Sequence, residues 1–136
     1  MKLSDGQNVS CALIPYACNG AIIKNVGIVN SVLELGDSNT AASVVGVVKK
    51  GKVTVSECFG TADVILNAGV SGGIIGSVPE DANVDIKNCS FTGDTSGNKN
   101  FSAAIIGQLE GTGSKVDSCF GSTAKNSRFI GGGKAD

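Results

Sequence analysis

SECFG at residues 56–60 returns twice further along the chain, as IKNCSFTG at 86–93 and as DSCFG at 117–121. The cysteines of these segments, Cys58, Cys89 and Cys119, are separated by 31 and then 30 residues. A fixed period of roughly 20–50 residues is typical of solenoids, propellers and other repeat arrays. The sequence therefore predicts an architecture of repeated, stacked units.

A second set of segments keeps the same period. SVVG, GIIG and AIIG end in Gly46, Gly76 and Gly107, which are 30 and 31 residues apart. Two patterns in step indicate a structural repeat that covers most of the 136 residues, so we expect a single domain. Its predicted units are a divergent N-terminal coil at 1–40, repeats at 41–70, 71–101 and 102–125, and an incomplete repeat at 126–136.

Each unit contains short runs of β-branched residues rather than helical patterns. Val53 and Val55 flank Thr54, and NVDIK at 83–87 alternates in the same way, which is typical of half-buried strands. Helical repeats need longer runs, and a propeller blade needs four strands in about 40 residues. The sequence therefore predicts an all-β fold, a parallel, right-handed β-helix of about 4–5 coils, each with three short strands in ~30 residues.

The repeated cysteines have no partners of the kind that metal sites require. The chain has five cysteines, no histidine and no CxxC pair, so we predict no metal ligands and no cofactor. Stacked side chains point in parallel, which leaves their Cβ atoms farther apart than the ~3.8 Å of a disulfide. Cys58, Cys89 and Cys119 are therefore expected as buried free thiols. A bridge between Cys11 and Cys18 stays open.

The first run of each unit is apolar at two consecutive positions, as in Val44 and Val45. A flat strand would bury one of the two and expose the other. One hypothesis is therefore an exposed packing stripe of Val45, Ile75 and Ile106. The alternative, which we favour, is that Gly46, Gly76 and Gly107 create a bend that turns both residues inward.

No catalytic residue is predicted. Catalysis by a Cys–His pair or a serine triad is excluded because histidine is absent. Paired carboxylates on a β-helix could serve a polysaccharide-cleaving enzyme, but a solvated strand face of mixed charge explains them more simply. Asn88 is the acceptor residue in one of three N-glycosylation sequences and is expected on a strand. The candidate carboxylates are Asp63, Asp81, Asp85, Asp94 and Asp117.

Charge and hydropathy give no sign of nucleic-acid or membrane binding. Eleven basic residues face twelve acidic ones, for a net charge of −1, so no positive field favours nucleic acid. No run reaches the ~20 apolar residues of a membrane-spanning helix. The first residues, MKLSDGQNVS, are too polar for a signal peptide.

GGIIG at 72–76, followed by IKNCSFTG at 86–93, resembles the GLUG repeat of bacterial surface proteins, in which GGLVG precedes I.NCY.TG. The resemblance covers about residues 41–125, with SVVG and AIIG as departures from the first glycines. It implies β-helical repeats in secreted or surface-displayed, adhesin-like chains, where the repeats themselves are not catalytic.

The expected function is that of a non-enzymatic, extracellular β-solenoid segment, a spacer or a binding surface for a protein or glycan. Neither terminus shows an evident polar cap, so we expect end-to-end packing with copies of the chain or with neighbouring repeats. The alternatives are a self-assembling fibre subunit and a fragment of a polysaccharide-cleaving enzyme.

Overall fold

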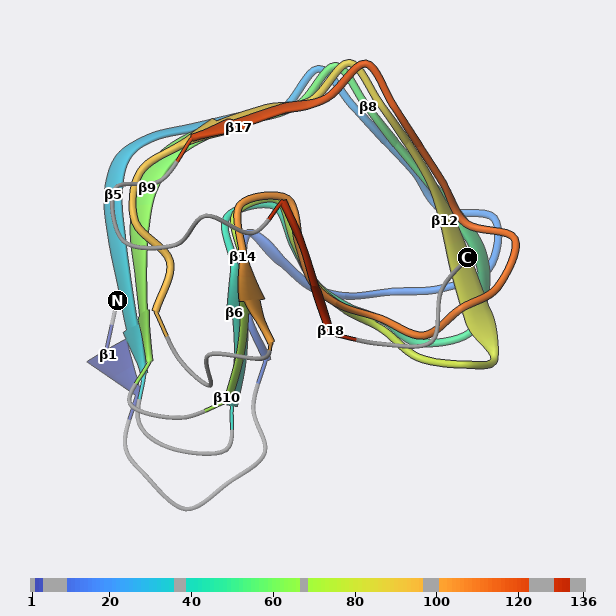
Figure 1. Ribbon diagram of the computed structural model, residues 1–136, viewed down its shortest axis with the longest axis horizontal. Coiled ribbons are helices and arrows are strands. Elements are labelled where there is room, and N and C mark those ends of the chain that lie inside the picture. The colour runs from blue at the N-terminus through green and yellow to red at the C-terminus, as the bar shows by residue number, and fades with distance from the viewer. Residues whose placement is uncertain are drawn as a thin grey trace.

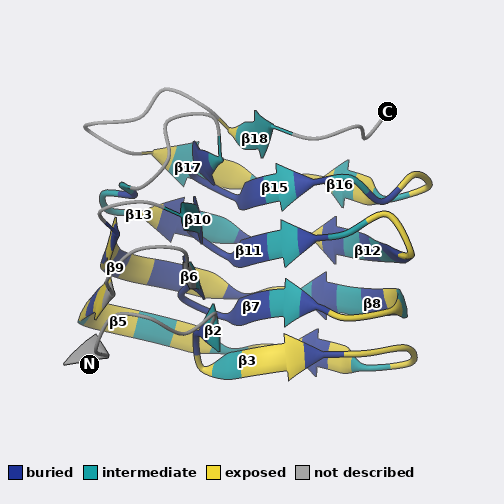
Figure 2. Cartoon of the chain, turned by 90° about the horizontal axis from the view of Figure 1, so that it is seen from below, coloured by how far each residue is buried: buried dark blue, intermediate teal, exposed yellow. Residues whose placement is uncertain are grey.

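The protein is a parallel β-solenoid of about three turns, each of about 31 residues and four strands. The computed structural model describes residues 2–3, 10–35, 39–66, 69–96, 101–122 and 129–132. Figure 1 looks along the stack, so that equivalent strands of successive turns lie over one another. In Figure 2 the turns are seen from the side as layers. The predicted all-β, parallel β-solenoid is confirmed, with about three turns in place of the predicted 4–5 coils.

Four parallel sheets run along the stack; each full turn contributes one strand to each, and partial turns toward both ends of the stack add the remaining strands. Sheet A contains β1 (Lys2–Leu3), β5 (Gly27–Leu35), β9 (Phe59–Leu66), β13 (Ser90–Thr92) and β17 (Phe120–Ser122). Sheet B contains β2 (Ser10–Cys11), β6 (Asn39–Ala42), β10 (Gly69–Gly72) and β14 (Ser102–Ala103). Sheet C contains β3 (Ile14–Ala17), β7 (Val45–Val48), β11 (Ile75–Val78), β15 (Ile106–Leu109) and β18 (Ile130–Gly132). Sheet D contains β4 (Ile22–Lys24), β8 (Gly51–Ser56), β12 (Ala82–Lys87) and β16 (Lys115–Asp117).

The prediction of three strands per turn is wrong, because a fourth short strand precedes the first apolar run of each unit. In the second turn this strand is β6, NTAA at 39–42, and a corner at Ser43 and Val44 separates it from β7. The backbone N–H groups of Val44 and Val45 both donate to the Ile74 carbonyl, at 3.3 and 3.0 Å. This shared acceptor shows that the chain changes direction here, and the same pattern recurs at Ile105 in the next turn.

The corner between sheets B and C buries both apolar residues of each pair. The members of the proposed stripe, Val45, Ile75 and Ile106, are 0% exposed, and so are their neighbours on the N-terminal side. The stripe hypothesis is therefore wrong. Both residues are turned inward, as the alternative predicts, but the bend lies at Ser43 and Val44 rather than at Gly46. Figure 1 shows the cause: the strands of sheets B and C form a narrow V whose tip points into the core. Residues on the outer side of this tip are therefore buried.

Glycine is required inside this V because the two strands approach closely. A Cβ atom added to Gly76 of sheet C would clash with the Thr40 Cγ2 of β6, in sheet B. A Cβ added to Gly107 would lie 2.6 Å from the Ser71 carbonyl oxygen. Both are closer than real contacts allow, so the glycine ladder marks the narrowest part of the V rather than a binding loop.

Register is kept from turn to turn, apart from one shift between Val29 and Ser31 where β5 pairs with β9. Val53 pairs with Val84, and Val45 pairs with Ile75, which are separations of 31 and 30 residues. Constant register places like residues in columns, so each inner turn buries the apolar side of its neighbours. The fully buried side chains of these columns include Val44, Val45, Val53, Val55, Ile74, Ile75, Val84, Ile105 and Ile106.

A second corner, between sheets D and A, uses one left-handed residue in every turn. The residue before Cys58 is Glu57, with φ of 53°, and the residue before Cys89 is Asn88, with φ of 52°. Asn88 is exposed and lies in this corner, so its predicted place on a strand is wrong. Asparagine tolerates this conformation better than most residues, whereas glutamate does not. The equivalent residues of the other turns are Asn25 and Ser118.

Reciprocal substitutions at this corner test the left-handed requirement. We expect Glu57→Asn to raise the free energy of unfolding by about 0.5–1 kcal/mol, because asparagine relieves the strain. The lost Lys24–Glu57 ion pair, 3.8 Å long and half exposed, contributes little. Asn88→Glu is the matched control and should lower stability by a similar amount in urea denaturation. A stabilised Asn88→Glu protein would contradict the role of this conformation.

Candidate functional site

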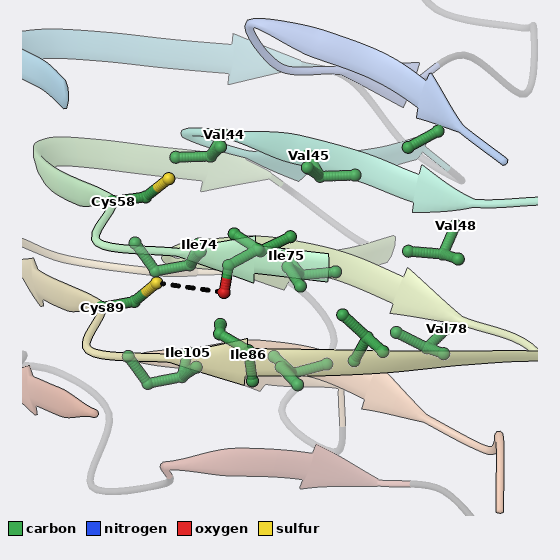
Figure 3. Packing of buried hydrophobic residues seen from close by; sticks show 14 of the residues in the cluster. Val44, Val45, Val48, Cys58, Ile74, Ile75, Val78, Ile86, Cys89 and Ile105 are labelled. Atoms are coloured by element: carbon green, nitrogen blue, oxygen red, sulfur yellow. Dashed lines mark hydrogen bonds between the residues drawn. The ribbon is translucent and has the colours of Figure 1, made fainter. Parts of the chain in front are cut away.

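The cysteine ladder lies at the corner between sheets D and A and points into the core. Cys58 and Cys89 are each 1% exposed, and Cys119 of the last turn is half-buried. Each thiol donates to the backbone carbonyl two residues earlier, at 3.3, 3.3 and 3.2 Å. Cys89 also approaches the Val55 carbonyl at 3.7 Å, the dashed contact in Figure 3. Cysteine therefore serves here as a small, buried donor that closes the corner.

The thiols are poorly suited to redox or metal chemistry. All five cysteines are free, so Cys11, which is buried, is not paired with the exposed Cys18. Burial raises the pKa of Cys89 from its ordinary value of 9.0 to about 12. Burial also raises the pKa of Cys11 and Cys119. Within the described part of the chain, no group of three or more metal-ligating residues comes together.

Alkylation should separate the cysteines by burial. Near neutral pH we expect iodoacetamide to modify Cys18 fastest, and Cys58 and Cys89 only after unfolding, because the reagent reaches the exposed thiol and not the buried ones. Peptide mass spectrometry measures each site. Rapid modification of Cys89 in the folded protein would contradict this assignment.

The raised pKa of Cys89 also predicts a loss of stability in alkali. The unfolded thiol ionises near 9.0 and the folded one near 12, so its contribution to stability is complete below pH 9.0. It is lost as the pH rises from there toward about 12. In urea titrations across this range, Cys89→Ala should show a shallower decline than the native protein. Cys18→Ala is the control and should follow the native slope.

The outer face of sheet D carries a grid of opposite charges. Asp85 lies between Thr54 and Lys115 in one column, and the Lys52 Nζ binds its Oδ2 at 2.7 Å. In the neighbouring column Lys87 pairs with Asp117 of the next turn. The Asp117 Oδ1 accepts a hydrogen bond from the Ser118 hydroxyl at 2.9 Å. The contacts are those of a strand face of mixed charge, on which Asp85 is partly buried and its Oδ1 has no hydrogen-bond partner among the described residues.

The remaining candidate carboxylates lie on other parts of the solenoid. Asp63 is exposed on β9, and its Oδ1 accepts the backbone N–H of Asp94 at 3.1 Å, one turn further along. Asp81 is exposed in the turn before β12. The five candidate carboxylates therefore lie in three places: on sheet D, in the loop directly before β12, and on the outer side of sheet A.

The outer face of sheet A presents aromatic rings beside hydroxyl groups. Phe59 is 45% exposed and Phe120 is 63% exposed. The Phe59 ring lies over Gly27 of the preceding turn, in space that a Cβ atom on residue 27 would otherwise occupy. Exposed Thr61, Thr92 and Ser122 form the neighbouring column. The signal for this surface in the sequence is the phenylalanine directly after two of the repeated cysteines.

A pocket of about 250 Å³ opens on the first turn. Its walls are apolar for the most part, with two serine hydroxyls. Sequence reasoning missed it, although the large Leu13 at the first corner, where later turns have valine or isoleucine, is a visible difference. The lining residues are Ala12, Leu13, Ile28, Ser31, Val32, Leu33 and Ser43.

No helix long and apolar enough to span a membrane occurs in the described ranges. Comparison with protein-family models, with curated proteins and with solved structures finds no match to this chain. The β-solenoid fold and the geometry of its corners and faces are therefore the basis on which function must be considered.

Proposed function

We propose that this chain is a rigid, non-enzymatic segment of an extracellular or cell-surface protein, a spacer whose outer faces bind a protein or glycan. The observation that carries this proposal is the unbroken column of buried residues through the inner turns, as at Val45, Ile75 and Ile106. Each turn buries its neighbours in the same way. A stack of this kind is stiff along its axis and gains ~4.8 Å of length with every turn.

The outer face of sheet A supports the binding part of the proposal. Exposed aromatic rings such as Phe120 present an apolar surface that can pack on a protein or on the apolar side of a sugar ring. The adjacent column of Thr61, Thr92 and Ser122 supplies hydroxyl groups as donors and acceptors at regular intervals. This combination of rigid aromatic and small hydroxyl residues favours recognition of a neutral, polar partner.

The two segments that resemble the GLUG motif lie at structurally important positions, which agrees with this proposal. GGIIG at 72–76 forms the corner between sheets B and C, and Asn88 and Cys89 form the corner between sheets D and A. The motif thus comprises the residues that turn the chain twice in each coil. Membership of an adhesin-like, secreted family of this kind, with its surface location, is part of what we propose.

Insertion of turns tests whether the segment is a modular spacer. Residues 53–83 span one turn because Val53 pairs with Val84. We expect one to four inserted copies of 53–83 to fold with equal or higher thermal stability, and to lengthen the stack by ~4.8 Å per copy in small-angle scattering. The control lacks one residue of each copy and should unfold, because a one-residue slip turns every side chain to the opposite face. Unfolding of the in-register series would contradict the proposal.

A fragment of a polysaccharide-cleaving enzyme is the competing function. Asp85 is held by Lys52, and Asp117 accepts the Ser118 hydroxyl, so both carboxylates of sheet D are engaged in local contacts. We expect no cleavage in a screen of acidic polysaccharides that measures newly formed chain ends. Cleavage by the purified chain that Asp85→Asn abolishes, while its circular dichroism stays unchanged, would establish the enzyme instead.

A further inference from the structure

The outer side of sheet A carries one column in which aromatic and small residues alternate. It runs along the stack as Gly27, Phe59, Ser90 and Phe120, because each of these residues pairs with the next in parallel register. Figure 2 shows the strands β5, β9, β13 and β17 of this sheet stacked one above another. Phe59 and Phe120 therefore stand two turns apart, at a spacing of ~9.6 Å, which is twice the distance between neighbouring strands.

The Phe59 ring lies flat against the sheet. A Cβ atom built on Gly27 would meet the Cζ, Cε1 and Cε2 atoms of this ring, the farthest of them at 2.7 Å. A ring that pointed edge-on at Gly27 would bring Cζ close and leave both Cε atoms clearly farther away. The glycine therefore makes room for one face of the ring, and the opposite face is directed outward from a side chain that is 45% exposed.

The outward position of this column does not depend on where the stack ends. Phe59 belongs to β9, which is paired on both sides, with β5 and with β13. Phe120 is 63% exposed, and its pairing with Ser90 places it in the same outer column. A further turn stacked beyond β17 would continue the column and leave its outer side facing the solvent.

Hydroxyl and carboxylate groups lie beside the aromatic column. The neighbouring outward column contains Thr61, Thr92 and Ser122, which is one hydroxyl per turn. Beyond it lies exposed Asp63, whose Oδ1 accepts the backbone N–H of Asp94 and whose carboxylate has further lone pairs for a ligand hydroxyl. The strands β5, β9, β13 and β17 contain acidic residues but no lysine or arginine. This face therefore suits an uncharged polymer and disfavours an anionic one.

An extended β-1,4-linked glycan has the geometry that this face requires. Each sugar of such a chain advances by close to one strand spacing, and successive sugars turn opposite faces to the same side. Sugars that are two apart therefore present the same apolar C–H face at about the spacing of Phe59 and Phe120. Aromatic rings pack well on such a face. The sugar between them would lie over Ser90, beside the column of hydroxyl groups.

We propose that the outer face of sheet A binds a neutral, β-1,4-linked glycan that lies parallel to the stack axis, with alternate sugars stacked on Phe59 and Phe120. This inference rests on the binding part of the proposed function and assigns one class of ligand to it. An α-1,4-linked glucan does not fit, because its chain curves and does not repeat one face at this interval. A protein partner would contact the same rings without any such period in its own chain.

Calorimetric titration of the purified chain with matched oligosaccharides tests the ligand. We expect cellotetraose to bind about tenfold more tightly than cellobiose, because cellobiose is too short to reach both rings and so loses one stacking contact. Maltotetraose contains the same four sugars in α-1,4 linkage and should bind at least tenfold more weakly than cellotetraose. In Phe120→Ala, the advantage of cellotetraose over cellobiose should disappear.

Variants of the column test each aromatic ring. Phe59→Ala and Phe120→Ala should each weaken cellotetraose binding about tenfold. Gly27→Ala retains both rings but displaces the Phe59 ring from the sheet, so it should also weaken binding. Tyr16→Ala is the matched control and should bind like the native chain, because it removes a ring that is 47% exposed on sheet C. Circular dichroism and thermal melting check that each variant is folded.

A native chain that does not bind cellotetraose at millimolar concentration would overturn the inference. Equal binding of maltotetraose, or an unchanged affinity in folded Phe59→Ala, would do the same. The turn-insertion series tests the spacer separately. Folded, lengthened inserts without glycan binding would retain the spacer and exclude this ligand, whereas unfolded inserts with cellotetraose binding in the native chain would retain the glycan site and exclude the modular spacer.

Discussion

The stacking of like residues in register is the constraint on which this structure depends. A turn of this solenoid has a thin cross-section and few large side chains, so it cannot bury its apolar residues alone. Val45 is fully buried because Ile75 covers it, and Ile75 is fully buried because Ile106 covers it. A slip of one residue between two turns would expose all of these side chains together. The constant period in the sequence follows from this requirement.

The two corners of each turn explain the residues that recur with that period. At the corner between sheets B and C, the V formed by the two sheets is too narrow for a side chain at Gly76 of β11, where a Cβ would meet Thr40 of β6. At the corner between sheets D and A, the left-handed conformation at Asn88 is followed by Cys89, whose thiol donates across the corner. The repeated glycine and cysteine are therefore requirements of the backbone path.

The sequence predicts the parts of the fold that depend on period and alternation. The parallel solenoid, the inward columns and the burial of both Val44 and Val45 follow from patterns that any turn displays. The fourth strand was missed because its members, such as NTAA in β6 and the two-residue β14, are short and rich in small or polar residues, so alternation gives no strand signal. The left-handed corner was missed because asparagine occupies it only in some turns, at Asn25 and Asn88, and Glu57 hides the pattern.

The surfaces that support a function were harder to predict than the core. Exposure of Phe59 and Phe120 depends on which side of β9 and β17 faces outward, and that side changes at the corner before each strand. The pocket on the first turn is lined by Leu13, where the inner turns have valine or isoleucine. The repeat period therefore does not predict it. The proposed binding function therefore rests on the outer faces, where side chains such as Phe59 and Phe120 are exposed.

The most direct test of the in-register stack is nuclear Overhauser spectroscopy of the isotope-labelled chain. Parallel pairing in sheet D predicts cross-peaks between backbone protons of Val53 and Val84, and of Val55 and Ile86. Cross-peaks that instead join Val53 to a residue one position from Val84 would contradict the stack. Their presence in the predicted register would establish the constraint from which the core and both corners follow.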